Sequence, residues 1–208
     1  MKVNGMPEVD LVITTRELSK MIREAGINFP SLPNEQFDSP MGESTGAAVI
    51  FGASGGVLEA ALRTASEWLT GKPLERVDFA MLRGITGIKQ ATVPVGDLDV
   101  RVAVASGLGN ARKLLEDIQS GREFYHAIEI MACPGGCIDG GGQPYHHGHI
   151  DILEKRTRAL FSEDVGKALR KSHENPAVQQ LYKDFLGEPY GEKARQLLHT
   201  TYTKRARI

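Results

Sequence analysis

Hydrophobic residues in the first two-thirds of the chain occur in short runs, separated by segments with a helical period. The apolar runs at 11–13 and 47–51 predict buried strands. A helix is predicted after each run, at 16–25 and 57–69, because apolar residues recur there every three or four positions. For the second helix the pattern predicts one inner face, made by Val57, Ala61, Ala65 and Trp68.

Between positions 88 and 104 the pattern changes to an alternation of apolar and polar residues, which is typical of strands. Gly96 and Asp97 interrupt the alternation and predict a hairpin turn. A helix with Ala111 and Leu114 on its inner side follows, and a strand at 125–131 leads to Cys133. Strands that alternate with amphipathic helices favour an α/β fold, here a layered, mainly parallel sheet with flanking helices. Ligands bind such sheets where loops leave the carboxyl ends of the strands.

From position 149 onward the pattern predicts helices only. A helix is expected to begin at Ser162, because two acidic residues follow it and negative charge favours a helix N-terminus. Asn175 and Pro176 predict the start of a further helix and Gly187 its end, and a last helix is expected at 192–199. We therefore expect two parts, an α/β lobe at residues 1–148 and an all-helical segment at 149–208.

Composition and charge narrow the class of protein. The 208 residues carry 25 Lys and Arg against 26 Asp and Glu, so there is no basic excess to neutralise a nucleic acid. Apolar residues make up 41% of the chain, which is enough for a core. No apolar run approaches the roughly 18 residues of a membrane span, and no secretory signal is visible at the amino end. We expect a cytoplasmic protein with no nucleic-acid or membrane partner.

The candidate chemistry lies in a short segment that holds both cysteines and many glycines. Cys133 and Cys137 are four positions apart, and five glycines occur between positions 135 and 142. Two thiolates that follow a strand suit a soft metal or an iron–sulfur cluster. Glycines let backbone N–H groups approach the sulfides of such a cluster, and these hydrogen bonds shift its reduction potential.

Other interpretations of these glycines and cysteines remain open. The two cysteines could be buried structural thiols, or zinc ligands together with the nearby His146, His147 and His149. A redox disulfide is less favoured, because its usual spacing is Cys-x-x-Cys. The glycine turns at 52–56 and 107–109 each precede a predicted helix, as in nucleotide-binding folds, but neither matches a phosphate-binding motif.

Residues 129–144, E-I-M-A-C-P-G-G-C-I-D-G-G-G-Q-P, resemble the last of three signature motifs of iron-only (FeFe) hydrogenases. Residues 12–18, 46–63 and 170–175 are also similar to that family, and the segment from about 150 resembles its small subunit. The resemblance is strongest to the catalytic subunit of NADP-reducing, multi-subunit hydrogenases. It implies that the α/β part is one lobe of the iron hydrogenase fold.

The resemblance implies a cofactor, the H-cluster, in which a 4Fe–4S cubane is joined to a two-iron subcluster. By motif position Cys133 would be a ligand of the cubane, and the Cys137 thiolate would bridge the cubane and the two-iron unit. Met131 would line the two-iron pocket, with Phe51 beside it. Electrons would leave through the cubane to a ferredoxin or to NAD(P)-linked electron-transfer subunits.

The sequence also departs from the family pattern. The family uses four cysteines, and the motifs T-S-C-C-P and M-P-C-x-x-K that carry the other two do not occur here. We therefore expect the C-terminal half of a catalytic subunit for reversible H2 oxidation and proton reduction, inactive alone. A missing N-terminal part or a second subunit would supply the other cysteines. The alternative is a hydrogenase-like iron–sulfur protein without the two-iron unit, acting in cluster assembly or sensing.

Overall fold

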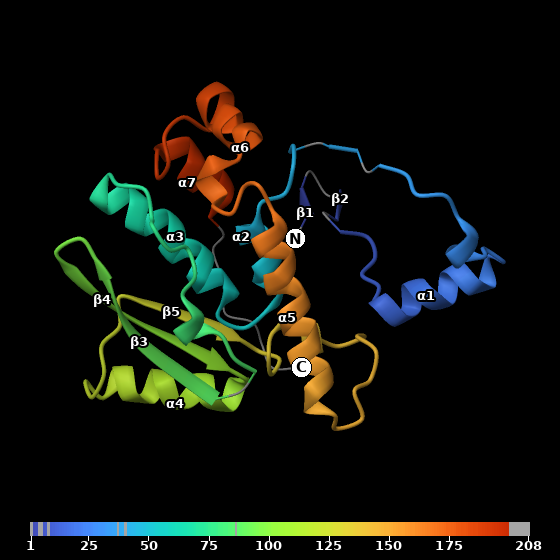
Figure 1. Ribbon diagram of the computed structural model, residues 1–208, viewed down its shortest axis with the longest axis horizontal. Helices are drawn as coiled ribbons and strands as arrows, with labels where there is room; N and C mark the ends of the chain where they lie inside the picture. Colours follow the sequence, from blue (N-terminus) through green and yellow to red (C-terminus); the bar gives the residue numbers. More distant parts are fainter. Residues whose placement is uncertain are drawn as a thin grey trace.

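The computed structural model describes residues 2–3, 6–7, 9–36, 38–39, 41–85 and 87–199. A three-stranded sheet lies between two helices, α3 (Gly56–Thr70) on one face and α4 (Leu108–Gln119) on the other (Figure 1). Helix α5 (Ile150–Gly166) lies beside this layered unit, and an amino-terminal arm with helix α1 (Thr15–Glu24) extends away from it. The α/β fold class predicted from the sequence is confirmed.

The sheet has the strand order β3 (Gly87–Val95), β4 (Leu98–Ser106), β5 (Ala127–Met131). Strands β3 and β4 are antiparallel and joined by the predicted hairpin, in which Gly96 has a φ of 60°. Strand β5 runs parallel to β4 and follows the crossover through α4. The sheet is therefore mixed, not mainly parallel, and β5 ends beside β4 where the cysteine segment begins.

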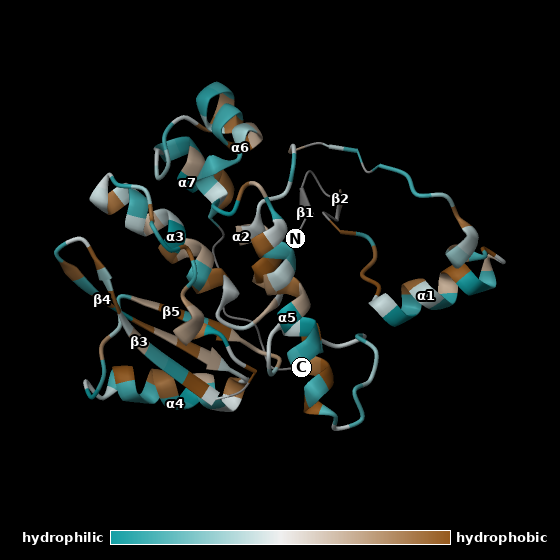
Figure 2. Ribbon diagram, in the orientation of Figure 1, coloured by the Kyte–Doolittle hydropathy of each residue, from teal (hydrophilic) through white to brown (hydrophobic). Residues whose placement is uncertain are grey.

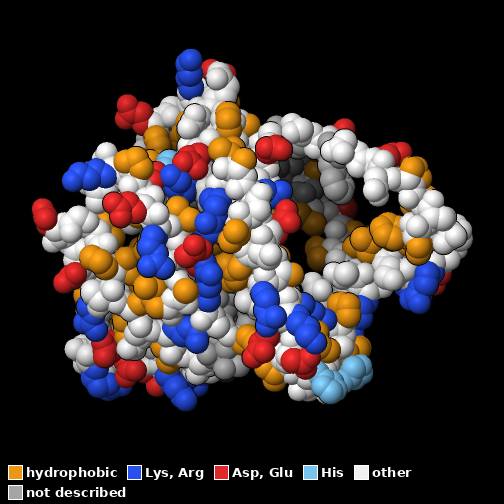
Figure 3. All heavy atoms as spheres, viewed as in Figure 1, with side chains coloured by type: hydrophobic (Ala, Val, Ile, Leu, Met, Phe, Trp, Pro, Cys, Tyr) orange, Lys and Arg blue, Asp and Glu red, His pale blue; other side chains and the backbone are white. Residues whose placement is uncertain are grey.

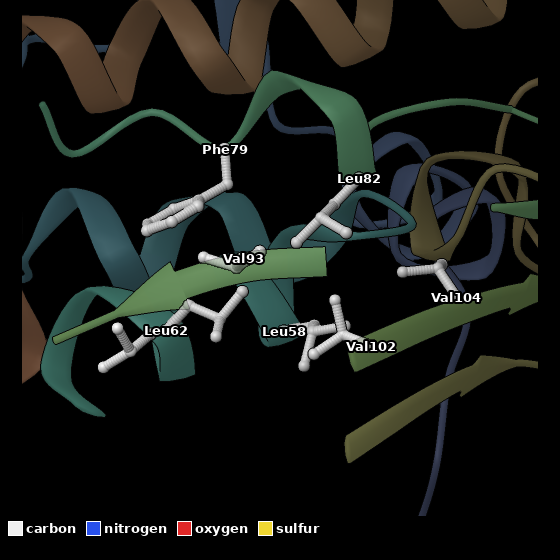
Figure 4. Packing of buried hydrophobic residues seen from close by; sticks show 8 residues of the cluster. Leu58, Leu62, Phe79, Leu82, Val93, Val102 and Val104 are labelled. Atoms are coloured by element: carbon white, nitrogen blue, oxygen red, sulfur yellow. The ribbon is translucent and has the colours of Figure 1, made fainter. Parts of the chain in front are cut away.

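The main core lies between α3 and the sheet, but the predicted inner face of α3 is wrong. Leu58 and Leu62 are the buried residues of α3 that pack against the sheet (Figure 4), whereas Trp68 is 55% exposed. The buried side of the helix also carries Glu59 and Arg63, which are fully buried and bonded to each other. Because these two charged residues lie on the buried face, the apolar periodicity of the sequence pointed to the other face of the helix.

Two strand predictions are wrong as well. The run at 11–13 forms no strand and is exposed, and it leads into α1, whose N-terminus is capped by Thr14. The run at 47–51 lies in helix α2 (Gly46–Val49) and the 3₁₀ turn Ile50–Gly52. A short continuous apolar run fits a buried helix as well as a buried strand, and only its neighbours distinguish the two.

The carboxyl-terminal part is helical, as predicted, with one boundary displaced. Helix α5 begins at Ile150, so Ser162 lies inside it instead of starting it. Asn175 caps α6 (Pro176–Leu181), a single π-helical turn follows at Tyr182–Leu186, and Gly187 ends it. Helix α7 covers Glu192–Leu198. Short 3₁₀ turns occur at Phe29–Ser31, Ala80–Leu82, Cys137–Asp139 and Ser172–Glu174.

The surface shows no single dominant charge on the face seen in Figure 3, where acidic and basic side chains are interspersed. Helix α1 has no buried residue, and apolar residues are spread along it (Figure 2). A two-residue antiparallel pair, β1 (Lys2–Val3) and β2 (Met6–Pro7), precedes the arm. In the part of the chain that the structure describes, none of the helices combines the length and apolar character that crossing a membrane requires.

Candidate functional site

The two cysteines lie at either end of a tight turn that follows β5. Cys133 is the second residue after the strand, and the Gly136 N–H donates a hydrogen bond to its carbonyl (3.0 Å). Cys137 then opens the 3₁₀ turn Cys137–Asp139. Both thiols are free, Cys133 half-buried and Cys137 exposed. The segment from Cys133 to Cys137, the cysteine loop, therefore presents two unpaired sulfur donors at the carboxyl end of a strand.

The centre of the cysteine loop is held by Gly135, whose backbone N–H and carbonyl both make hydrogen bonds to other segments. The Gly135 N–H donates to the Ser106 hydroxyl (2.8 Å), and the Gly135 carbonyl accepts from the Ser54 N–H (2.9 Å). The Ser106 hydroxyl in turn donates to the Ile85 carbonyl (2.8 Å). Since these partners come from three separate segments, the loop conformation depends on the whole α/β unit.

Gly136 shows why this loop needs glycine. Its φ is +95°, a region that side-chain-bearing residues rarely adopt. A Cβ at this position would lie 2.8 Å from both the Gly52 carbonyl oxygen and the Ser54 nitrogen. The cysteine loop therefore lies directly against the backbone at 52–54, without an intervening side chain.

This contact brings another predicted site segment to the cysteine loop. Phe51 lies in the 3₁₀ turn Ile50–Gly52, beside the backbone that Gly136 contacts, and its side chain is 46% exposed. Met131 is the last residue of β5, half-buried, and its carbonyl accepts a hydrogen bond from the Gly107 N–H (2.8 Å). The turn of Phe51 and the strand end of Met131 thus flank the same loop.

Three polar residues at this place were not identified from the sequence. Ser54 and Ser106 hold Gly135, and Glu129 accepts hydrogen bonds from backbone N–H groups at the start of α3. All three are buried. The only sequence signal was weak, an acidic residue in an otherwise apolar strand and serines beside glycines, because their partners are distant along the chain.

The amino-terminal arm contacts the glycines that follow the cysteine loop. The Arg16 N–H donates to the Gly142 carbonyl (3.2 Å), and the Arg16 guanidinium lies 4.0 Å from the centre of the Tyr145 ring. Gly142 has a φ of +91°, and a Cβ there would collide with the Thr14 side chain. The start of α1 is therefore joined to the segment at 142–145.

The histidines after the loop do not complete a cation site with the cysteines. His146 Nε2 is 3.4 Å from Asp139 Oδ1, and His149 Nδ1 is 3.9 Å from Asp151 Oδ1. Within the described ranges, no group of three or more His, Cys, Asp or Glu side chains is arranged to hold a metal ion. The zinc interpretation therefore gains no support from the arrangement of these side chains.

The residues of the loop do fit an iron–sulfur group that has further ligands elsewhere. Two free thiols are the soft donors that such a group requires. The backbone at Gly135 and Gly136 carries no Cβ atoms, and the Ser54 hydroxyl is buried beside it without a hydrogen-bond partner. Two sulfurs alone do not complete a four-thiolate site, so such a group would need two further thiolates.

Comparison with known families agrees with this chemistry. Residues 1–141 match the family described as "Iron only hydrogenase large subunit, C-terminal domain", and residues 150–205 match "Iron hydrogenase small subunit". The chain belongs to the iron-only hydrogenase family. The resemblance inferred from the signature motif is thereby confirmed.

Individual relatives are much longer than this chain. The NADP-reducing hydrogenase subunit HndD of Solidesulfovibrio fructosivorans is 60% identical over 206 residues, covering 99% of this chain and 35% of that protein. Iron hydrogenase 1 of Clostridium pasteurianum is 41% identical, covering 98% of this chain and 36% of that protein. The cytosolic Fe-S cluster assembly factor narfl of Xenopus tropicalis is 33% identical, covering 94% and 41%. The chain thus spans between about a third and two-fifths of the length of these curated relatives.

Solved structures show the same fold. The FeFe-hydrogenase HydA(deltaEFG), whose structure concerns stepwise H-cluster assembly, superimposes with a TM-score of 0.76 at 42% identity, covering 96% of this chain and 57% of that one. A variant of the FeFe-hydrogenase HydA1 from Chlamydomonas reinhardtii gives a TM-score of 0.75 at 43% identity, with the same coverage. The α/β unit and the helical end therefore form part of the FeFe-hydrogenase fold.

Proposed function

We propose that this chain is the C-terminal part of an FeFe-hydrogenase catalytic subunit and contributes to reversible H2 oxidation and proton reduction. The observation that carries the proposal is the pair of free thiols at Cys133 and Cys137, held on a Cβ-free backbone after β5 in a member of this family. In this proposal residues 1–148 form the large-subunit lobe, and residues 149–208 form the small-subunit-type segment.

The proposal gives each candidate residue a role at the H-cluster. Cys133 would be a ligand of the cubane, and Cys137 would bridge the cubane and the two-iron subcluster. Met131 and Phe51 would form apolar walls beside the two-iron unit. When bound, the cluster supplies the chemistry that splits and forms the H–H bond and stores the electrons. The chain itself anchors the loop between the two cysteines through the hydrogen bonds of Gly135 to Ser106 and Ser54.

The other two cluster cysteines would come from outside these 208 residues. The motifs T-S-C-C-P and M-P-C-x-x-K are absent from the sequence. The hydrogenase relatives are longer polypeptides, so the rest of such a hydrogenase, or a second subunit, would supply them. A ferredoxin or an NAD(P)-linked electron-transfer subunit would receive the electrons, in keeping with the name of the NADP-reducing relative. We place the assembled protein in the cytoplasm.

A second candidate function is iron–sulfur cluster assembly or sensing without the two-iron unit. It is supported by the 33% identity to the cytosolic Fe-S cluster assembly factor narfl, which extends over 94% of this chain. The 60% identity to a hydrogenase subunit favours the first proposal.

The test is to co-produce this chain with the complementary amino-terminal part of the NADP-reducing relative, mature the complex, and measure iron content and hydrogen evolution from a reduced viologen dye. We expect activity from the pair, none from the 208 residues alone, and loss of activity in Cys133→Ser and Cys137→Ser. His149→Ala, an exposed histidine in the same region, is the control. Hydrogen evolution by the chain alone, or activity in both cysteine variants, would contradict the proposal. Iron binding without hydrogen evolution would favour the cluster-assembly function.

A further inference from the structure

Glu129 is a buried acid that bonds to the start of another element. It lies in β5, is 7% exposed, and accepts hydrogen bonds from the Gly55 N–H (2.6 Å) and the Leu58 N–H (2.8 Å). These two N–H groups belong to the N-cap residue and the first turn of α3, where the backbone donors have no partner within the helix. A carboxylate at this end of a helix is also favoured by the helix dipole. Glu129 therefore caps helix α3 from strand β5.

The close packing of the turn before α3 explains why the cap comes from so far away. The N-cap residue is Gly55, which has no side chain to accept a hydrogen bond. A Cβ at Gly55 would collide with the Leu82 carbonyl, and one at Gly56 would collide with the Ile50 carbonyl. Ser, Thr, Asp or Asn, the residues that usually cap a helix, would meet these carbonyls there. The carboxylate of Glu129, 74 positions away from Gly55, satisfies the N–H groups instead.

The same acid thereby joins the two segments that flank the candidate cluster site. Glu129 is four positions before Cys133 on one segment, and Gly55 is four positions after Phe51 on the other. The two segments meet again at the bond from the Ser54 N–H to the Gly135 carbonyl (2.9 Å). Two separate links, one through a carboxylate and one through the backbone, thus fix the separation of the Phe51 turn and the cysteine loop.

We propose that Glu129 is a positioning residue for the cluster site, which holds the Phe51 turn and the cysteine loop in register before any iron is bound. This inference rests on the proposed function and deepens it. Glu129 makes no contact with the reacting atoms in this proposal and acts through Gly55 and Leu58. Its effect should therefore be visible in the metal-free chain as well as in the properties of the bound cubane.

The decisive variant is Glu129→Gln, which keeps the size of the side chain and removes one of its two acceptor oxygens. One of the two N–H groups is then left unpaired, and an unpaired buried donor weakens the structure around it. In the metal-free chain we expect amide hydrogen exchange at Gly55 and Leu58 to become about tenfold faster or more. We also expect the ratio of iodoacetamide alkylation rates at Cys133 and Cys137 to change.

The second measurement uses the co-produced complex described above, loaded with iron. We expect Glu129→Gln to alter the electron paramagnetic resonance spectrum and the midpoint potential of the cubane. Glu129→Asp keeps the charge with a shorter reach, and should give intermediate values in both measurements. If the Gln variant does not fold, the same two measurements on Glu129→Asp test the proposal.

Asn175→Ala is the matched control, because Asn175 also caps a helix, accepting from Ala177 and Val178 at the start of α6. It should lower the free energy of unfolding while leaving the alkylation ratio and the cubane spectrum unchanged. If Glu129→Gln behaves like Asn175→Ala in these two measurements, the positioning role is overturned. If the wild-type complex binds no iron, the proposed function fails, whereas exchange and alkylation in the metal-free chain still decide the role of Glu129.

Discussion

Arg63 on α3 and Asp164 on α5 form a two-point ion pair in which neither side chain has exposed surface. Arg63 Nη1 lies 2.8 Å from Asp164 Oδ1, and Arg63 Nη2 lies 2.8 Å from Asp164 Oδ2. Glu59 and Arg170 add further bonds to the same pair. Burial raises the pKa of Asp164, but the bonds from the two arginines outweigh it and leave that pKa below its ordinary value. This pair joins the part that matches the large subunit to the part that matches the small subunit.

Asp164→Asn tests how much this buried ion pair contributes to stability. Removing one charge leaves the fully buried Arg63 guanidinium without its main partner, and breaking a buried pair in this way costs about 3–5 kcal/mol. We expect the free energy of unfolding, measured by urea titration, to fall by that amount. Asp151→Asn on the same helix removes an exposed pair with Lys155 and should have little effect. If both variants change the free energy of unfolding equally, the buried pair contributes no more to stability than the exposed one.

Gly136→Ala tests the close contact beneath the cysteine loop. The added Cβ meets backbone atoms of Gly52 and Ser54 at a positive φ, so the loop must move. We expect the free energy of unfolding to fall by about 1–3 kcal/mol. Gly141→Ala is the control in the next turn, since its Cβ would meet nothing within 4 Å and its φ is not in the unfavourable region. A Gly136→Ala protein as stable as Gly141→Ala would refute the contact.

Ser106→Ala tests the support of the loop from the sheet. It removes the acceptor for the Gly135 N–H and leaves the Ile85 carbonyl without this donor, at a buried site. We expect a loss of about 1–3 kcal/mol in the free energy of unfolding, together with faster hydrogen exchange at Gly135. Ser120→Ala removes an exposed hydroxyl that bonds to the Asp117 carbonyl and should change neither quantity. Unchanged exchange at Gly135 would contradict the assignment.

Glu67 predicts a particular pH dependence. Burial raises its pKa, but hydrogen bonds from Lys171, the Leu74 N–H and His173 outweigh this and lower the pKa to about 2. A carboxyl whose pKa is lowered on folding contributes stability above its unfolded pKa of about 4.5, and that contribution is lost as the pH falls toward 2.

We therefore expect Glu67→Gln to lower the free energy of unfolding by about 1–2 kcal/mol at pH 7. The difference from the wild type should shrink as the pH is lowered from 4.5 toward 2. Denaturant titrations at a series of pH values would show this convergence. A difference that stays constant over that range would mean that another property of the side chain is responsible.

The elements that the sequence predicted correctly depend on local information. The hairpin at Gly96, the strand before the cysteines and the Asn175 cap each have their signal within a few residues. The errors occur where a distant partner decides. The face of α3 is set by Arg63, whose partner Asp164 is 101 positions away, and the run at 47–51 is helical because of its surroundings, although its composition also suits a strand.

In the candidate site, too, the residues with a local signal in the sequence were found and those with distant partners were not. Cys133, Cys137 and the glycines could be found in the sequence because they cluster there. Ser106 and Glu129 could not, because each acts on backbone groups of remote segments, and a side chain that bonds to backbone leaves no partner residue to search for. The sequence pattern could therefore indicate the candidate ligands but not the side chains that hold the loop in place.

The contact between Arg16 and the segment at 142–145 has a consequence for the order of events during synthesis. The arm leaves the ribosome more than a hundred residues before Gly142 and Tyr145 do, so its contact with these two residues forms only late in the synthesis of this part of the chain. The arm is therefore joined to the lobe only after the cysteine loop, at residues 133–137, has itself been made.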